Sequence, residues 1–365
     1  MKILDSINII LVLWSRIIPT HRCNQFLAVG WLTVVMGLFF SSCSSDTDNA
    51  DGGRMISMPI VLAIPANNAD LTTGKTDAKA TRAEGDPGTY EKFELPKYLY
   101  IYLINTSINE TETKVLTPEG MGKDGYSLDS KKWTKTTTKD NNKDSIYTYT
   151  DQIRIIIPEN RKTGVVYAAM STVPITVSGV DNPATVADAT FTLGKEAKDN
   201  ESEALKNLYS SPYNLPKNNQ YYGIVSDYNS NSPYINMVLY HVASKLDVQW
   251  NVDASVQDKV KLSKITLTGL SGGGKLFKPL ENTASSSTYD ETFTLDAGSQ
   301  WYGRKATYVI PVKTDGEYQF PMTLTNSVSG SNKEATAKAT PSTTANTIFV
   351  PWIYGTVKVT PQTQW

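Results

Sequence analysis

Histidine and cysteine, the side chains that most often act as nucleophiles, bases or metal ligands, are scarce in this chain. Its 365 residues include two histidines, His21 and His241, and two cysteines, Cys23 and Cys43. The first 42 residues have the pattern of an export signal, so we expect a mature chain that keeps only His241 and Cys43. This inventory excludes zinc chemistry and a Cys–His pair, because each needs several such side chains together.

Other catalytic patterns are also missing from the sequence. His241 lies in a strand pattern, where a packed or surface histidine is the common case, and no serine lies in a GxSxG string. The string SGGGK around Gly272 lacks the spacing of a phosphate loop and predicts a turn between strands. The acids lie in polar segments that would not raise a carboxyl pKa, and no calcium loop occurs. We therefore expect no enzymatic activity, no cofactor and no metal.

Charge and aromatic content bear on two kinds of ligand. Lys+Arg 35 against Asp+Glu 36 gives a formal net charge of -1, which disfavours nucleic acid as a partner. Exposed rings are the usual platform for sugars, and the candidates are Trp133, Trp301, Tyr302 and the pair Tyr221 and Tyr222. Sandwich cores use such rings more often than sugar sites do. A lipid-anchored glycan-binding protein of a surface nutrient-uptake system stays open as an alternative.

The N-terminal region predicts export and lipidation. Residues 26–40, FLAVGWLTVVMGLFF, are almost wholly apolar and follow Arg16 and Arg22. We interpret residues 1–42 as a signal peptide, because the apolar run is too short for a comfortable bilayer span. The string LFFSSC ends at Cys43 and resembles a bacterial lipobox, in which the cysteine thiol is acylated, with palmitate as an expected chain. The outer membrane lipid is then a partner of the precursor.

An acidic tether and an alternating segment follow Cys43. The tether SSDTDNADGG resembles the acidic surface-export signal of Bacteroidetes lipoproteins. In residues 54–66, RMISMPIVLAIPA, apolar side chains at every second position predict a strand with one buried face. Pro59 and Pro65 fall on the other face and lack a backbone donor, so we expect a detachable edge strand. Its core-facing residues are Ile56, Met58, Ile60, Leu62 and Ile64.

A polar linker separates this strand from the rest of the chain. Residues 67–89 contain almost no large apolar side chain and include a lone arginine, Arg82, followed by Ala83. An arginine in a solvated segment is a good substrate for a trypsin-like protease, because the backbone can adopt the extended form that the protease binds. The polar linker therefore favours a protease cut at Arg82.

The remaining sequence predicts a mainly β protein. Charged residues make up only 19% of the chain, and Tyr98 to Leu103 alternate aromatic and aliphatic side chains, which favours a strand. We predict a loop over residues 130–144 and a helix over residues 195–209. Two β-sandwich domains follow from the blocks of strand candidates, with proposed bounds of 83–240 and 241–365.

The C-terminal segment predicts a strand suited to an external partner. It lies between Pro351 and Pro361, which isolate it from a hairpin of its own. Such a strand can add to the sheet of another molecule. The candidate donor-strand residues are Trp352, Ile353, Tyr354, Val357 and Val359.

These features together resemble the fimbrillins, the major-subunit pilins of Bacteroidetes type V pili. The strings ELPKYLYIYL and LYHVASKLDVQW are similar to the strands that open the two domains of that family. The resemblance implies two transthyretin-like sandwiches in tandem, export to the cell surface, and cleavage between Arg82 and Ala83 by a maturation protease. Release of residues 43–82 would open an apolar groove for a strand of another subunit. The implied function is that of a shaft or tip pilin in an adhesive fimbria, with other pilin subunits as partners.

Overall fold

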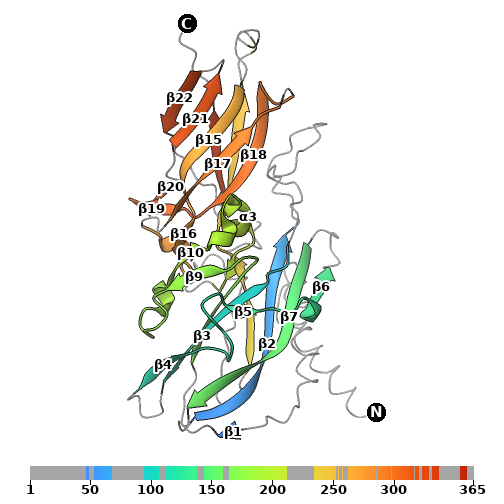
Figure 1. Cartoon of the computed structure of the whole chain (residues 1–365), viewed down its shortest axis with the longest axis vertical. Coiled ribbons are helices and arrows are strands. Elements are labelled where there is room, and N and C mark those ends of the chain that lie inside the picture. The colour runs from blue at the N-terminus through green and yellow to red at the C-terminus, as the bar shows by residue number, and fades with distance from the viewer. Residues whose placement is uncertain are drawn as a thin grey trace, which may run out of the picture. The chain divides into compact units, whose positions relative to one another are not determined.

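The described part of the protein is mostly β-strand, as its computed structural model shows (Figure 1). The structure describes residues 47–48, 53–67, 94–106, 112–137, 144–158, 164–211, 234–251, 254, 257, 262–283, 287–296, 298–315, 317–319, 323–328, 331–336 and 354–359. Within these ranges α3 (Glu201–Lys206) is the α-helix, and the short 3-10 helices are η1 (Ser130–Lys132), η2 (Val186–Asp188), η3 (Lys195–Ala197) and η6 (Pro279–Glu281). The predicted mainly β class is confirmed.

The first sheet contains the longest strands. Strand β2 (Gly53–Asn67) pairs antiparallel with β7 (Asp144–Pro158), and β6 (Trp133–Thr137) continues the sheet beyond β7. On the other side of β2 lie β1 (Thr47–Asp48) and β12 (Ile235–Val238). The β12 pairing is parallel, whereas the other pairings in this sheet are antiparallel.

The second sheet is packed on both faces at its central strand β3 (Tyr98–Thr106). Its order is β13 (Tyr240–His241), β11 (Tyr209–Ser210), β8 (Val165–Ser171), β3 and β4 (Thr113–Leu116), with β5 (Tyr126–Ser127) also paired to β3. Leu99, Ile101 and Leu103 of β3 face the cluster that the first sheet also lines. Tyr100 and Tyr102, at the alternate positions, enter a second cluster. The aromatic and aliphatic residues that alternate along β3 therefore pack into two different hydrophobic clusters.

Three small sheets and a fourth of four strands complete the fold. One contains β16 (Gly273–Lys275), β10 (Thr190–Leu193) and β9 (Ile175–Ser178), and another contains β18 (Tyr302–Val309), β14 (Ser244–Asn251) and β23 (Tyr354–Val359). The four-stranded sheet has the order β17 (Thr288–Thr294), β15 (Leu262–Ser271), β21 (Thr323–Val328) and β22 (Ser331–Thr336). Strands β19 (Val312–Thr314) and β20 (Glu317–Gln319) form a hairpin. The second hydrophobic cluster draws residues from β10, β14, β15 and β18.

Two local predictions are wrong. Residues 195–209 do not form one helix, because Asp199 has a left-handed φ of 65° between η3 and α3. Residues 130–144 contain η1 and β6 in place of a continuous loop, since the threonines of Trp133–Thr137 favour extended backbone.

The glycines of SGGGK also behave differently from the predicted turn. Gly273 and Gly274 lie within β16 and pair with Thr192 and Phe191 of β10. A Cβ at Gly274 would lie 2.6 Å from the side-chain amide of Asn282. Glycine is therefore required here for close approach of a side chain to the strand rather than for a turn.

The boundary between two sandwich domains near residue 240 stays a prediction. Strand β16 follows that boundary in sequence but pairs with β10, which precedes it. The described residues 47–137 and 144–359 all belong to one structural unit.

Candidate functional site

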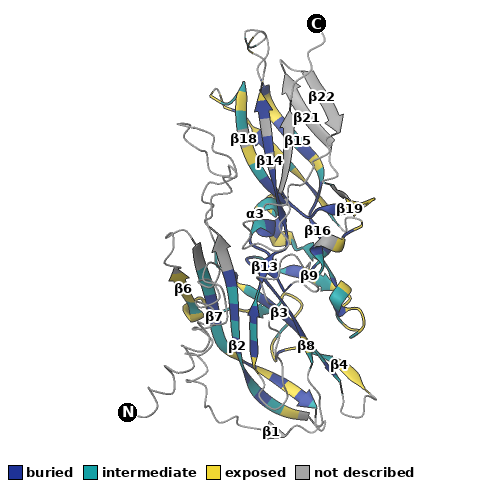
Figure 2. Cartoon of the chain, turned by 180° about the vertical axis from the view of Figure 1, so that it is seen from behind, coloured by how far each residue is buried: buried dark blue, intermediate teal, exposed yellow. Residues whose placement is uncertain are grey.

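Strand β2 presents its five predicted core residues to the interior. Along β2, buried side chains alternate with half-buried ones (Figure 2), as a strand with one buried face requires. All five contribute to the same hydrophobic cluster, and the exposed fractions are 4% for Ile56 and 0% for Met58, Ile60, Leu62 and Ile64. Burying each such side chain contributes roughly 1.5–3 kcal/mol. The strand is therefore a large part of this core.

Strand β7 holds β2 along its whole length. The register runs without a shift from Gly53 opposite Pro158 to Asn67 opposite Asp144. Tyr149, Ile153 and Ile155 of β7 lie in the same cluster as the five β2 residues. The opposite sheet closes the cluster with Leu99, Ile101 and Leu103 of β3. The slot of β2, meaning the space bounded by β7, β12 and this core, is thus lined by apolar side chains.

The prediction that β2 is a free edge strand is wrong over part of its length. Strand β12 pairs with it in parallel, from Ile235 opposite Ile60 to Val238 opposite Ala63, and β1 pairs with Met55 and Arg54. The parallel pairing covers four of the fifteen residues of β2. Strand β2 therefore lies between two neighbours at its centre, and its removal would leave backbone groups unpaired on both.

The two prolines fit this arrangement. The backbone N–H of Leu239 donates to the carbonyl oxygen of Ala63 over 2.8 Å, so the backbone groups of Ala63 face β12. Successive residues of a strand present these groups to opposite neighbours, which places Pro59 and Pro65 on the β12 side as well. Both prolines lie outside the stretch from Ile60 to Ala63 that β12 pairs with. Neither proline therefore removes a donor from the ladder with β7.

The C-terminal donor candidate is paired within its own chain. Strand β23 lies parallel to β14, from Lys245 opposite Tyr354 to Trp250 opposite Val359. The backbones of Tyr354, Val357 and Val359 are thus part of this sheet, while Trp352 and Ile353 lie outside the described residues. A donor role in the slot of β2 requires that this segment first leave β14, because that slot has β7 on one side and β12 on the other and so occupies both edges of a strand.

Several predicted sites lie outside the described residues. These are the signal peptide 1–42, the lipidation candidate Cys43, and the cleavage candidates Arg82 and Ala83. They stay predictions. In the described part of the chain, no helix is long and apolar enough to cross a membrane.

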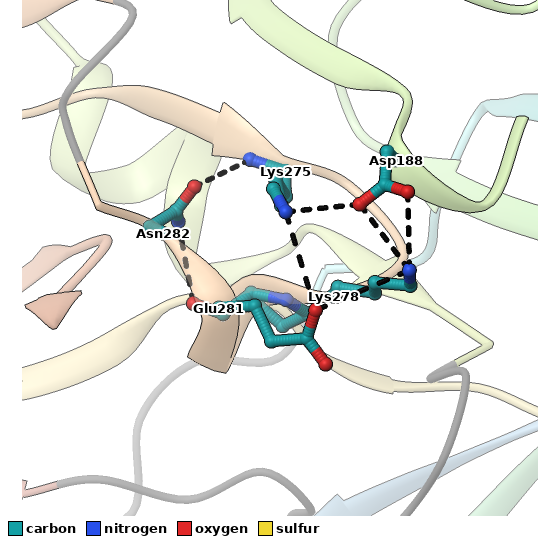
Figure 3. A network of polar contacts seen from close by, with 6 residues as sticks. Asp188, Lys275, Lys278, Glu281 and Asn282 are labelled. Atoms are coloured by element: carbon teal, nitrogen blue, oxygen red, sulfur yellow. Dashed lines mark hydrogen bonds and ion pairs between the residues drawn. The ribbon is translucent and has the colours of Figure 1, made fainter. Parts of the chain in front are cut away.

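Figure 3 shows a network of polar contacts around Asp188 that includes Lys275, Lys278, Glu281 and Asn282. The Lys275 Nζ lies 2.9 Å from the Asp188 Oδ1, and the Lys278 Nζ lies 3.1 Å from its Oδ2. Hydrogen bonding to Lys275 is the main cause that lowers the pKa of Asp188, and Lys278 adds to it. Asn282 accepts from the backbone N–H of Lys275 over 2.7 Å. The network ties η2 to β16 and η6, so its role is structural.

His241 is packed, as the sequence predicts for a histidine in a strand. It is 8% exposed, and its Nδ1 donates to the carbonyl oxygen of Lys206 over 2.9 Å, since a carbonyl can only accept. Its ring packs against that of Tyr209, with centroids 4.5 Å apart and the ring planes tilted by 46°. Burial lowers the pKa of His241 to about 3. Among the described residues no group of three His, Cys, Asp or Glu side chains is placed to bind a metal ion.

Two of the five aromatic candidates for a sugar platform are packed. Trp133 contacts Tyr149 with ring centroids 5.3 Å apart. Trp301 packs against the second cluster, and its Nε1 donates to the carbonyl oxygen of Gln257 over 3.1 Å. Tyr302 is 66% exposed, and the Tyr221–Tyr222 pair lies outside the described residues.

Comparison with known proteins finds similar solved structures but no matching sequence. No family model and no curated protein matches the chain. The tip fimbrial protein Mfa3 of Porphyromonas gingivalis, solved with a C-terminal truncation, is 11% identical and has a TM-score of 0.33, over 76% of this chain and 81% of that one. A candidate cell adhesion protein of Bacteroides eggerthii is 10% identical with a TM-score of 0.37, over 84% and 86%.

A fimbrial assembly protein of Parabacteroides distasonis is similar at the same level. It is 11% identical with a TM-score of 0.33, over 83% of this chain and 91% of that one. These three solved structures are of fimbrial and cell adhesion proteins rather than enzymes. At such identities and TM-scores the likeness carries no argument about function, which must rest on the strand arrangement. The structural neighbours are Bacteroidetes fimbrial and adhesion proteins, the class that the sequence resembles.

Proposed function

We propose that this protein is a structural subunit, a shaft or tip pilin, of an adhesive cell-surface fimbria. The single observation that supports this most is the placement of β2. Five of its side chains fill an apolar core, and the polar residues 67–89 that follow it contain Arg82. A strand that is central to a core but joined to the rest by a cleavable linker suits replacement by an equivalent strand.

The proposed maturation begins with export and lipidation at Cys43 and ends with a cut between Arg82 and Ala83. Residues 43–82, which include β2, then leave the protein. An emptied slot would expose apolar side chains and the unpaired backbone groups of β7 and β12, which is a strong drive for a new strand to bind. Because β2 has neighbours on both sides at residues 60–63, we infer that release and replacement occur together, rather than by peeling of an edge.

The incoming strand must reproduce what β2 supplies. It needs apolar side chains at alternate positions, an antiparallel ladder with β7 and a short parallel ladder with β12. The C-terminal segment of another subunit, around Trp352–Val359, is the proposed donor. In the uncut chain its residues 354–359 pair with β14, so exchange between subunits requires release of that pairing as well.

The test is limited digestion of the full chain with an arginine-specific protease, followed by non-boiled gel electrophoresis. We expect a cut after Arg82 and then a ladder of oligomers. Arg82→Ala should abolish both events, while Arg161→Ala, which changes another arginine of the chain, should leave both intact. Clean cutting after Arg82 with a lasting monomer would overturn the proposed assembly.

A further inference from the structure

One continuous run of the chain pairs with both the first long strand and the last described strand. Strand β12, residues 235–238, lies parallel to β2, and strand β14, residues 244–251, lies parallel to β23. Five residues, 239–243, separate β12 from β14. Strand β2, which the proposed maturation removes, and strand β23, the proposed donor, therefore pair with the same run of the chain, residues 235–251.

This run is buried throughout its connection. The exposed fractions are 0% for Leu239, 2% for Tyr240, 8% for His241 and 1% each for Val242 and Ala243. The backbone N–H of Val242 donates to the carbonyl oxygen of Leu208 over 3.0 Å. A buried, hydrogen-bonded connection of this length has little freedom to absorb a displacement of either end.

The run also contributes to both hydrophobic clusters. Ile235, Met237 and Leu239 pack in the cluster of β2. Five residues further along the run pack in the second cluster, namely Val242, Ala243, Leu246, Val248 and Trp250. Packed side chains of this kind can transmit a shift from one core to the other.

Loss of β2 would act on the run directly. Among the described strands, β2 is the one that pairs with β12, so its departure removes the whole β12 ladder and the bond from Leu239 to Ala63. Ile235 and Met237 would also lose β2 as a packing partner. Strand β14 keeps β18 as its other neighbour, opposite all eight of its residues, so the sheet would persist while its β23 edge loosens.

We propose that residues 235–251 couple the two strands, so that opening of β2 loosens β23 and opening of β23 loosens β2. The coupling would keep the C-terminal strand on β14 until the slot opens, and this regulatory meaning rests on the proposed function. Coupling between two sites is reciprocal, so each opening must favour the other by the same factor. We expect a factor of about ten, within the usual range of such couplings.

The first test is amide hydrogen exchange of the full, uncut chain with one core deletion in β2. Leu62→Ala should raise the exchange of β2, of β12 and, about tenfold, of β23. Leu103→Ala is the matched control, because Leu62 and Leu103 are both 0% exposed in the same cluster but lie on opposite sheets. In the control variant, the amide exchange of β23 relative to that of β22 should stay unchanged. If Leu62→Ala opens β2 without any change in β23, the coupling does not exist.

The second test opens β23 instead of β2. It tests the coupling even if Leu62→Ala does not raise the exchange of β2. Val357→Pro removes a backbone N–H from β23, and Ala335→Pro does the same in β22. The first change should raise the exchange of β12 and β2 by the same factor, and the second should not. Equal effects of the two changes, or none, would overturn the proposal.

Both tests use uncut protein, so they do not depend on cleavage after Arg82. Oligomer ladders without coupled exchange would leave the fimbrial function standing and reject the coupling. Coupled exchange without ladders would establish the coupling between β2 and β23 but would reject its proposed role in assembly.

Discussion

The backbone N–H of Leu239 donates to the carbonyl oxygen of Ala63 over 2.8 Å. This one bond assigns each residue of β2 to a neighbour, because alternate residues of a strand face opposite sides. The residues in phase with Ala63, including Pro59 and Pro65, face β12, and the five core residues direct their backbone groups to β7. The asymmetry explains how a strand with two prolines pairs on both sides.

A first prediction concerns proline scanning of β2. Ser57 is in phase with Ala63, outside the residues that β12 pairs with, whereas Met58 faces the long ladder with β7. Ser57→Pro should lose little beyond the side-chain bond from Ser57 to Gln152. Met58→Pro should destabilise the fold strongly, since it removes a ladder donor and a buried side chain. Urea unfolding compares the two, and equal losses would contradict the assignment of sides.

A second prediction concerns lipidation. If Cys43 is the acylated residue, Cys43→Ala should abolish incorporation of labelled palmitate in an exporting bacterial host and release the protein from the membrane fraction. Cys23→Ala, which changes the cysteine within the predicted signal peptide, is the matched control and should keep the label. Loss of the label in Cys23→Ala alone would show that Cys23, and not Cys43, is the acylated residue.

A third prediction concerns the Asp188 network. Lys275 and Lys278 lower the pKa of Asp188 from its ordinary value of 3.8, so the stability it contributes is present above that value and is lost as the pH falls through the lowered pKa. The Asp188 side chain is 48% exposed, and solvent screening limits the loss in Asp188→Asn to about 1 kcal/mol or less.

The control for this network is Glu281→Gln, because Glu281 lies 4.0 Å from both lysines. Its effect on the free energy of unfolding at neutral pH should be smaller than that of Asp188→Asn. The Asp188→Asn loss should also shrink in high salt and vanish in strong acid. An effect of Asp188→Asn that persists at low pH would show that the ion pairs are not its cause.

A fourth prediction concerns His241. Its folded-state pKa of about 3 lies below the ordinary value of 6.5, so between these values the unfolded chain binds the proton more readily. Stability should therefore fall as the pH falls from 6.5 towards 3. His241→Asn keeps an N–H for the Lys206 carbonyl and should flatten this part of the unfolding profile. An unchanged slope in the variant would assign the pH dependence to other groups.

Local features of the fold could be predicted from the sequence. The alternation from Ile56 to Ile64 identified the buried face of β2, and the alternation from Tyr98 to Leu103 identified a strand, whose two faces the structure shows to be packed. Such predictions succeed because the period of two in a strand depends on neighbouring residues alone.

The partners of the strands could not be predicted in the same way. Prolines at positions 59 and 65 indicated an edge, yet β12 fits between them, and it comes from a segment that follows β2 by roughly 170 residues of sequence. The glycines at 273 and 274 indicated a turn, yet they pair with β10, and Gly274 leaves room for the side chain of Asn282.

The amino-acid sequence by itself determined which side chains of β2 are apolar and where prolines interrupt its donors, and it named candidates for lipidation and cleavage. Only the tertiary structure decided that β2 lies between β7 and β12, and that the C-terminal strand β23 lies on β14. The physical reason is that side-chain periodicity is local, whereas a strand's neighbours depend on which distant segments bury their apolar faces in the same core.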